Sequence, residues 1–196
     1  LGSTSEDGSC KLWVIPEGGI EDHVKDCDGI LKGHTKKVLA LRWHRIADNV
    51  LATHSSDLTV RVWDDENQKS TMMFEDLPNF CTAMRWNPDG KTLGVVCKGG
   101  EMVNFDPRSK GEIMRGPSHN GPKACKLAWV DENFLITSGS NKQAEREYAV
   151  WDRRDMSKKV AGGFLGTGLG VGHLYFDEQH KLLYSAGRGE QQIGIW

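Results

Sequence analysis

Several features that assign a function are missing from this 196-residue sequence. No apolar run approaches the roughly 18 residues that a membrane-spanning helix needs. Neither sign of charge prevails, since 25 Lys and Arg stand against 27 Asp and Glu and the net charge is −2. This balance gives no electrostatic reason to expect nucleic acid or an anionic membrane as a partner.

Cysteines are few and widely scattered. There are five, an odd number, and no two form a C-x-x-C pair. A disulfide framework or a zinc site would show a tighter pattern. The sequence therefore predicts reduced thiols and a cytosolic location. The cysteines are Cys10, Cys27, Cys81, Cys97 and Cys125.

Catalytic motifs are also missing. The sequence contains no G-x-S-x-G, H-E-x-x-H or P-loop pattern. The glycines of residues 166–172 are spaced G-x-G-x-G-x-G and precede a strand pattern, which predicts an inter-strand loop instead of a dinucleotide site. The carboxylates Asp64, Asp65 and Asp152 follow the ends of expected strands, where they face solvent.

Histidines are present but give no metal-binding pattern. Their spacing does not place two of them on one metal ion. We therefore expect no enzyme activity, no cofactor and no metal. The seven histidines are His23, His34, His44, His54, His119, His173 and His180.

Glycine and tryptophan, in contrast, are abundant, with 23 and 7 residues respectively. Aromatic residues recur in two interleaved series whose members are 42 to 50 residues apart. Two registers that stay in step over the whole chain indicate an internal repeat. One series is Trp13, Trp63, Phe105, Trp151 and Trp196, and the other is Trp43, Trp86, Trp129 and Phe176.

One complete repeat can be read in residues 33–64, GHTKKVLALRWHRIADNVLATHSSDLTVRVWD. Apolar residues alternate in three short segments, which is typical of half-buried strands. A Gly-His pair opens the repeat and a Trp-Asp pair closes it, the signature of a WD40 β-propeller blade. The sequence therefore predicts an all-β propeller. We expect a structural hydrogen-bonded tetrad formed by His34, Thr53, Asp57 and Trp63.

The repeats divide the chain into about four and a half blades. The ranges are 1–31 (part blade), 32–77, 78–117, 118–162 and 163–196 (part blade). Gly99 stands where the tetrad would need Asp in the 78–117 blade, so this blade should depend on packing alone. Because such propellers usually close with seven blades, we expect the chain to be a piece of a longer protein.

Basic residues in the expected turns form a candidate partner-binding face. If the Gly-His loops and the Asp-bearing turns share one face, that face carries several cations suited to an acidic protein surface. An ordinary solvated rim would have the same composition, so both interpretations stay open. The residues are Lys36, Lys37, Lys98, Lys142, Arg146 and Arg188.

Five stretches together resemble the coronins, a family of WD40-repeat actin-binding proteins. They are 31–36 (LKGHTK), Cys97-Lys98 followed by 106–108 (DPR), 137–139 with Glu145-Arg146, 151–152 (WD), and 187–190 (GRGE). The sequence of residues 58–63 (LTVRVW) is most similar to sequences in the second propeller of the long, tandem-propeller coronins.

The resemblance implies a seven-bladed, non-enzymatic scaffold that binds actin filaments and actin regulators. It also implies a cytoplasmic, cytoskeleton-associated location, with the Golgi as a further location of the tandem members. The alternative is a WD40 interaction platform in membrane traffic or ubiquitin pathways without direct actin contact. The sequence gives no oligomeric state.

Overall fold

The computed structural model describes residues 1–19, 24–75, 77–109, 111–168 and 170–196, without the side chains of residues 111–113. All regular elements of the described residues are strands, joined by turns. Accordingly, no described segment is a helix with the length and apolar character needed to cross a membrane. The chain divides into two compact units, residues 1–80 and 81–196.

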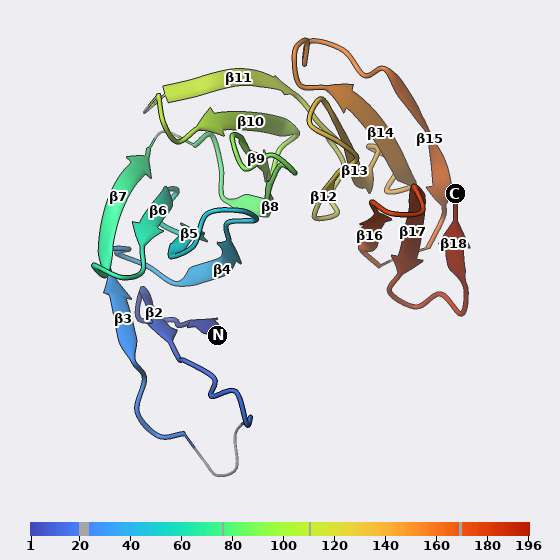
Figure 1. Ribbon diagram of the computed structural model, residues 1–196. Coiled ribbons are helices and arrows are strands. Elements are labelled where there is room, and N and C mark those ends of the chain that lie inside the picture. Colours follow the sequence, from blue (N-terminus) through green and yellow to red (C-terminus); the bar gives the residue numbers. More distant parts are fainter. Residues whose placement is uncertain (20–23, 76, 110, 169) are drawn as a thin grey trace. The chain divides into compact units, whose positions relative to one another are not determined.

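Unit 1 contains two antiparallel sheets (Figure 1). The first has the strand order β1-β2-β3 and the second β4-β5-β6-β7. The strands are β1 (Gly2–Thr4), β2 (Ser9–Leu12), β3 (Gly29–Lys32), β4 (Val38–Trp43), β5 (Val50–Ser55), β6 (Val60–Asp64) and β7 (Lys69–Phe74).

Unit 2 contains three antiparallel sheets with the orders β11-β10-β9-β8, β12-β13-β14-β15 and β16-β17-β18. In the first of them the four strands lie side by side in that order (Figure 1). The strands are β8 (Cys81–Trp86), β9 (Leu93–Cys97), β10 (Glu101–Asp106), β11 (Gly111–Pro117), β12 (Lys126–Trp129), β13 (Phe134–Ser140), β14 (Arg146–Asp152), β15 (Ala161–Gly166), β16 (Gly172–Asp177), β17 (Leu182–Gly187) and β18 (Ile193–Ile195).

This architecture confirms the all-β prediction and the partial propeller. Three sheets have four strands each, as a WD40 blade requires, and two have three strands. Within each sheet, strands that are consecutive in sequence pair with each other in antiparallel fashion.

The sheets divide the chain slightly differently from the sequence-based ranges. β3 extends one residue past position 31, and β15 extends from 161 to 166 across the division placed at 162. β15 pairs with β14, with Ala149 opposite Gly162, so it completes the sheet of the preceding repeat. Gly162 and Gly163 therefore belong to a strand.

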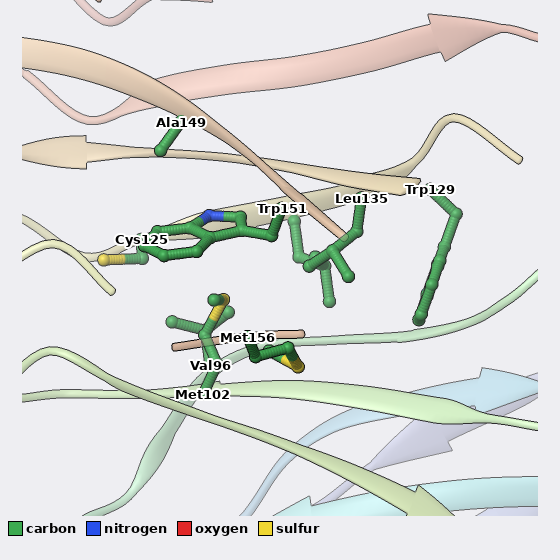
Figure 2. Packing of buried hydrophobic residues seen from close by; sticks show 9 residues of the cluster. Val96, Met102, Cys125, Trp129, Leu135, Ala149, Trp151 and Met156 are labelled. Atoms are coloured by element: carbon green, nitrogen blue, oxygen red, sulfur yellow. The ribbon is translucent and has the colours of Figure 1, made fainter. Parts of the chain in front are cut away.

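Five of the recurring aromatic residues are buried: Trp63, Trp86, Phe105, Trp129 and Trp151. In unit 1, Trp63 packs with Leu12, Leu31 and Leu51 in one buried cluster. In unit 2, Figure 2 shows the Trp151 indole lying over Val96 and Met102, so that two neighbouring sheets meet face to face. Burying an aromatic side chain of this size contributes on the order of 2–3 kcal/mol. The repeat in the sequence thus marks core positions in the middle of the chain, whereas Trp43 and Trp196 are exposed.

Two cysteines lie opposite each other in the first sheet of unit 2. Cys81 in β8 is the register partner of Cys97 in β9, and both are at most 3% exposed. Burial raises the pKa of the Cys81 thiol well above its usual value, and the neighbouring Cys97 acts in the same direction. The five cysteines are reduced in this structure.

Candidate functional site: hydrogen-bonded turns and cationic loops

The four predicted tetrad residues lie together in the sheet β4–β7. The indole N–H of Trp63 donates to the Thr53 hydroxyl oxygen at 2.8 Å. The same hydroxyl lies 2.7 Å from His34 Nε2, and His34 Nδ1 lies 3.0 Å from an Asp57 carboxylate oxygen. The chain of contacts links a loop, two strands and a turn of one blade.

The donors and acceptors in this hydrogen-bonded tetrad determine which nitrogen of His34 carries the proton. The ionised Asp57 carboxylate can only accept, so His34 Nδ1 carries the proton and donates to it. His34 Nε2 then accepts from the Thr53 hydroxyl, whose oxygen accepts the Trp63 N–H. Burial lowers the pKa of His34, although Asp57 acts to raise it, which favours this neutral imidazole. The contact between His34 and Asp57 is therefore a charge-assisted hydrogen bond and not an ion pair of two charged groups.

The Asp57 turn has further donors of its own. The Thr35 amide donates to Asp57 at 3.0 Å, and the Thr59 amide and hydroxyl donate to it at 3.0 and 2.8 Å. Burial acts to raise the pKa of Asp57, but these hydrogen bonds and the one from His34 outweigh it and lower the pKa to about 2. The carboxylate is thus ionised and locks the turn between β5 and β6.

A second chain of the same kind exists in the sheet β12–β15. Trp151 Nε1–H donates to Thr137 Oγ1 at 2.8 Å, and this hydroxyl lies 2.9 Å from His119 Nε2. His119 Nδ1 lies 2.7 Å from Glu147 Oε1, so a glutamate on β14 replaces the turn aspartate. The aromatic series in the sequence includes Trp151, but no sequence motif indicated that Thr137 and Glu147 join it in this chain of contacts. Thr137 lies in the second strand of its sheet, as Thr53 does, so an alignment of the two strands would have predicted that Thr137 supplies the hydroxyl.

The sheet between these two repeats has no such chain. The positions that correspond to Thr53, Asp57 and Trp63 hold Val95, Gly99 and Phe105. Val95 and Phe105 are at most 3% exposed. Gly99 adopts a φ of 101°, which an L side chain rarely tolerates. In the sheet β8–β11, apolar packing and a glycine turn therefore replace the hydrogen-bonded residues of the neighbouring sheets.

The described residues hold no group of three or more His, Cys, Asp or Glu side chains that could bind a metal ion. His23, one of the seven histidines, lies outside the described residues. His34 and His119 lie in the two hydrogen-bonded chains, and His180 contacts Asp177 at 2.8 Å on the surface. The two hydroxyl–imidazole pairs, Thr53 with His34 and Thr137 with His119, are buried.

The predicted cationic residues of unit 1 lie in the His34 loop. Lys36 and Lys37 are exposed, and Lys37 Nζ contacts Glu6 Oε1 at 2.5 Å. The loop is tied to the Asp57 turn, because Ser55 Oγ donates to the Lys36 carbonyl at 2.9 Å and the Ser56 amide donates to the Lys37 carbonyl at 3.0 Å. The two lysines are thus held beside the structural turn.

In unit 2, Lys98, Lys142 and Arg188 are exposed, and each lies after the second strand of its sheet. Hydrogen bonds link the loops that bear them. The Ser118 amide donates to the Gly100 carbonyl at 2.7 Å, and the Gly121 amide donates to the Ser140 carbonyl at 2.8 Å. The Lys98 and Lys142 loops are thus connected through residues 118–121 along one edge of unit 2, and Arg146 Nη2 connects β14 with the Arg188 carbonyl.

Arg146 does not belong to the exposed face, and this prediction was wrong. Its side chain is only 2% exposed. Arg146 Nε donates to the Gly170 carbonyl at 2.8 Å, Nη2 donates to the Arg188 carbonyl at 3.3 Å, and Nη1 pairs with Glu190. The guanidinium has five donors in a fixed fork, which suits it to hold several loop carbonyls at once. It positions the loops instead of meeting a partner.

Lys123 is a cation on this edge that residue reasoning missed. Its Nζ donates to the Gly168 carbonyl at 2.5 Å, and its amide donates to Ser140 Oγ at 3.1 Å. No sequence motif marks it, because its place depends on the path of the 118–125 loop.

Comparisons with known proteins agree with this geometry. A family profile described as "WD domain, G-beta repeat" matches residues 25–64. Human "Coronin-7" is 32% identical over 203 residues, which include the whole chain and 22% of the relative. The "Coronin-like protein" of Saccharomyces cerevisiae is 32% identical over 206 residues, with 98% of this chain and 31% of that protein covered.

Among solved structures, the "WD40 domain from Toxoplasma gondii coronin" superposes with a TM-score of 0.92 at 28% sequence identity. The match covers 99% of this chain and 51% of that one. The chain therefore spans between about a fifth and a third of the curated relatives that it matches here, and about half of the solved domain. On the tetrad geometry, the repeated sheets and these matches, the chain has the WD40-repeat fold and is similar to coronins over its whole length.

Proposed function

We propose that this chain is part of a non-enzymatic actin-filament-binding scaffold that regulates the organisation of the actin cytoskeleton. The similarity to coronins over the whole length of the chain supports this function. The tandem-propeller type is the proposed subtype. Its location is the cytoplasm at actin structures, and association with the Golgi would follow from the tandem type.

The proposed contact surface is the cationic edge of unit 2, defined by Lys98, Lys142 and Arg188. These side chains are exposed. Backbone hydrogen bonds connect the Lys98 and Lys142 loops through residues 118–121, and the Arg146 side chain holds the Arg188 loop. Such a surface suits an acidic protein, because complementary charges speed the encounter and fix its orientation. Lys36 and Lys37 provide a second cationic loop in unit 1.

Co-sedimentation with actin filaments tests the proposal. The purified protein is incubated with filaments at low and at high salt and then centrifuged. We expect it to pellet with filaments at low salt and less at high salt, because screening weakens contacts between exposed charges. Absence of the protein from the filament pellet at both salt concentrations would refute actin binding.

A further inference from the structure

A groove in unit 1 opens at the strand ends opposite those that hold the His34 loop. It has a volume of about 590 Å³ and lies between the connections of the sheets β1–β3 and β4–β7. Its apolar part is formed by Trp13, Val14, Ile15 and Trp43. Val14 is 71% exposed and Ile15 49%, which is unusual for large aliphatic side chains without a covering partner.

The walls of the groove are fixed by hydrogen bonds. The side chain of Gln68 spans the two sheets: its oxygen accepts from the Ile30 amide at 3.3 Å and its amide donates to the Asp28 carbonyl at 3.5 Å. Asp28 Oδ2 accepts from the Val14 amide at 2.7 Å and so holds the apolar wall. A ligand would meet a groove that is already formed, which lowers the entropic cost of binding.

Acidic side chains stand around this apolar part. Asp28, Asp65 and Glu66 line the groove, and no Lys or Arg side chain is among its described lining residues. Throughout the described parts of the chain, the Asp65 and Glu66 carboxylates have no cationic side chain within ion-pair distance. The Leu1 amino group donates to the Trp13 carbonyl at 2.7 Å. Burial raises the pKa of Asp65, and the neighbouring Asp64 acts in the same direction, whereas the positive Leu1 amino group acts to lower it.

We propose that this groove binds an extended peptide segment of a partner protein in which Arg or Lys alternates with aliphatic residues. The aliphatic side chains would cover Val14, Ile15 and Trp43, and the cations would pair with Asp65 and Glu66. An extended segment presents successive side chains in opposite directions, so one segment can meet the apolar wall and the acidic wall at the same time. The site is separate from the cationic loops and does not depend on actin binding.

Fluorescence anisotropy with synthetic peptides tests the proposal. The probe is a fluorescein-labelled octapeptide of alternating Arg and Leu, and the purified protein is the titrant. Two peptides of equal length, alternating Glu and Leu or Arg and Ser, serve as comparisons. We expect binding of the Arg-Leu peptide, binding at least about tenfold weaker for Arg-Ser, and none for Glu-Leu. Equal binding of all three, or of none, overturns the proposal.

The variant D65N/E66Q should weaken binding of the Arg-Leu peptide by about tenfold or more, since it removes charge-assisted contacts. The matched control E17Q/E75Q removes two exposed carboxylates of unit 1 outside the groove and should bind as the parent does. An equal loss of peptide binding in both variants would mean that the peptide responds to the net charge of the protein, and it would overturn the proposed site. Sedimentation velocity is the second readout: a dimer that I15E dissociates would show that a second copy, and not a peptide, covers the groove.

Discussion

At the scale of single residues, the Thr53 hydroxyl lies at the centre of the hydrogen-bonded tetrad of unit 1. It joins Trp63 to His34, and both partners are buried. The variant T53V keeps the volume but leaves the indole N–H and the imidazole nitrogen without this partner. We expect the free energy of unfolding to fall by about 1–3 kcal/mol, measured by urea denaturation.

The control for T53V is T35V, in the same loop system. The Thr35 side chain is exposed, and only its backbone amide contacts Asp57. We expect a change within about 0.5 kcal/mol for this surface substitution. A loss as large as that of T53V would show that the effect comes from the valine and not from the hydrogen-bonded chain.

Protonation of His34 at acidic pH should lower the stability of unit 1. Its pKa is lowered in the folded protein, mainly by burial, from an ordinary value of 6.5. Below that value the unfolded chain binds more protons than the folded one, so stability is full above about pH 6.5 and falls as pH decreases. Urea unfolding at pH 7, 6 and 5 should show this decline, and H34Q should flatten it. An unchanged slope in H34Q would contradict the assignment.

Asp57 extends the acid dependence to lower pH. Its pKa is about 2 in the folded protein, against an ordinary 3.8. Its contribution is therefore present above about pH 4 and lost as the pH falls toward 2.

At the scale of elements, Arg146 connects β14 with two loops. Its guanidinium contacts the carbonyls of Gly170 and Arg188 and pairs with Glu190. In R146M these groups lose their donors, so residues 187–190 and the described part of the 166–172 segment should become more open. Hydrogen exchange should report faster deuterium uptake in peptides from these segments.

The matched control is R154M. Arg154 is exposed and pairs with Asp152 two residues away, so its loss should leave exchange in these loops unchanged. Equal uptake in R146M and in the parent protein would mean that the guanidinium does not hold the loops.

The elements also show what the sequence could predict. Strands, turns and the tetrad follow from local patterns, because alternation, Gly-His and Trp-Asp lie within one repeat. The role of Arg146 could not be predicted, since its partners are backbone carbonyls 24 and 42 residues away. For the same reason Glu147 was missed: its partner His119 lies in a different loop, and no short motif joins them.

At the scale of the whole molecule, the proposed function rests on exposed charge. The triple variant K98E/K142E/R188E reverses the cationic edge of unit 2. We expect it to bind actin filaments at least about tenfold more weakly at low salt, and the difference should shrink at high salt. Co-sedimentation over a range of filament concentrations gives both values.

The control is the triple variant K158E/K159E/K181E, which changes the net charge by the same amount as K98E/K142E/R188E. These lysines are exposed and lie in turns after the third strand of one sheet and the first strand of another, away from the cationic edge. This variant should bind filaments nearly as the parent does. Equal losses in both triple variants would assign binding to net charge and not to the edge.

The buried, opposed thiols of Cys81 and Cys97 can report how often strands β8 and β9 separate. A buried, protonated thiol does not react with an alkylating reagent until its strand detaches, so the labelling rate measures how often β8 and β9 separate. Half-buried Cys27 should label first in a time course followed by mass spectrometry. Labelling of all five cysteines at one rate would mean that the chain opens as a unit.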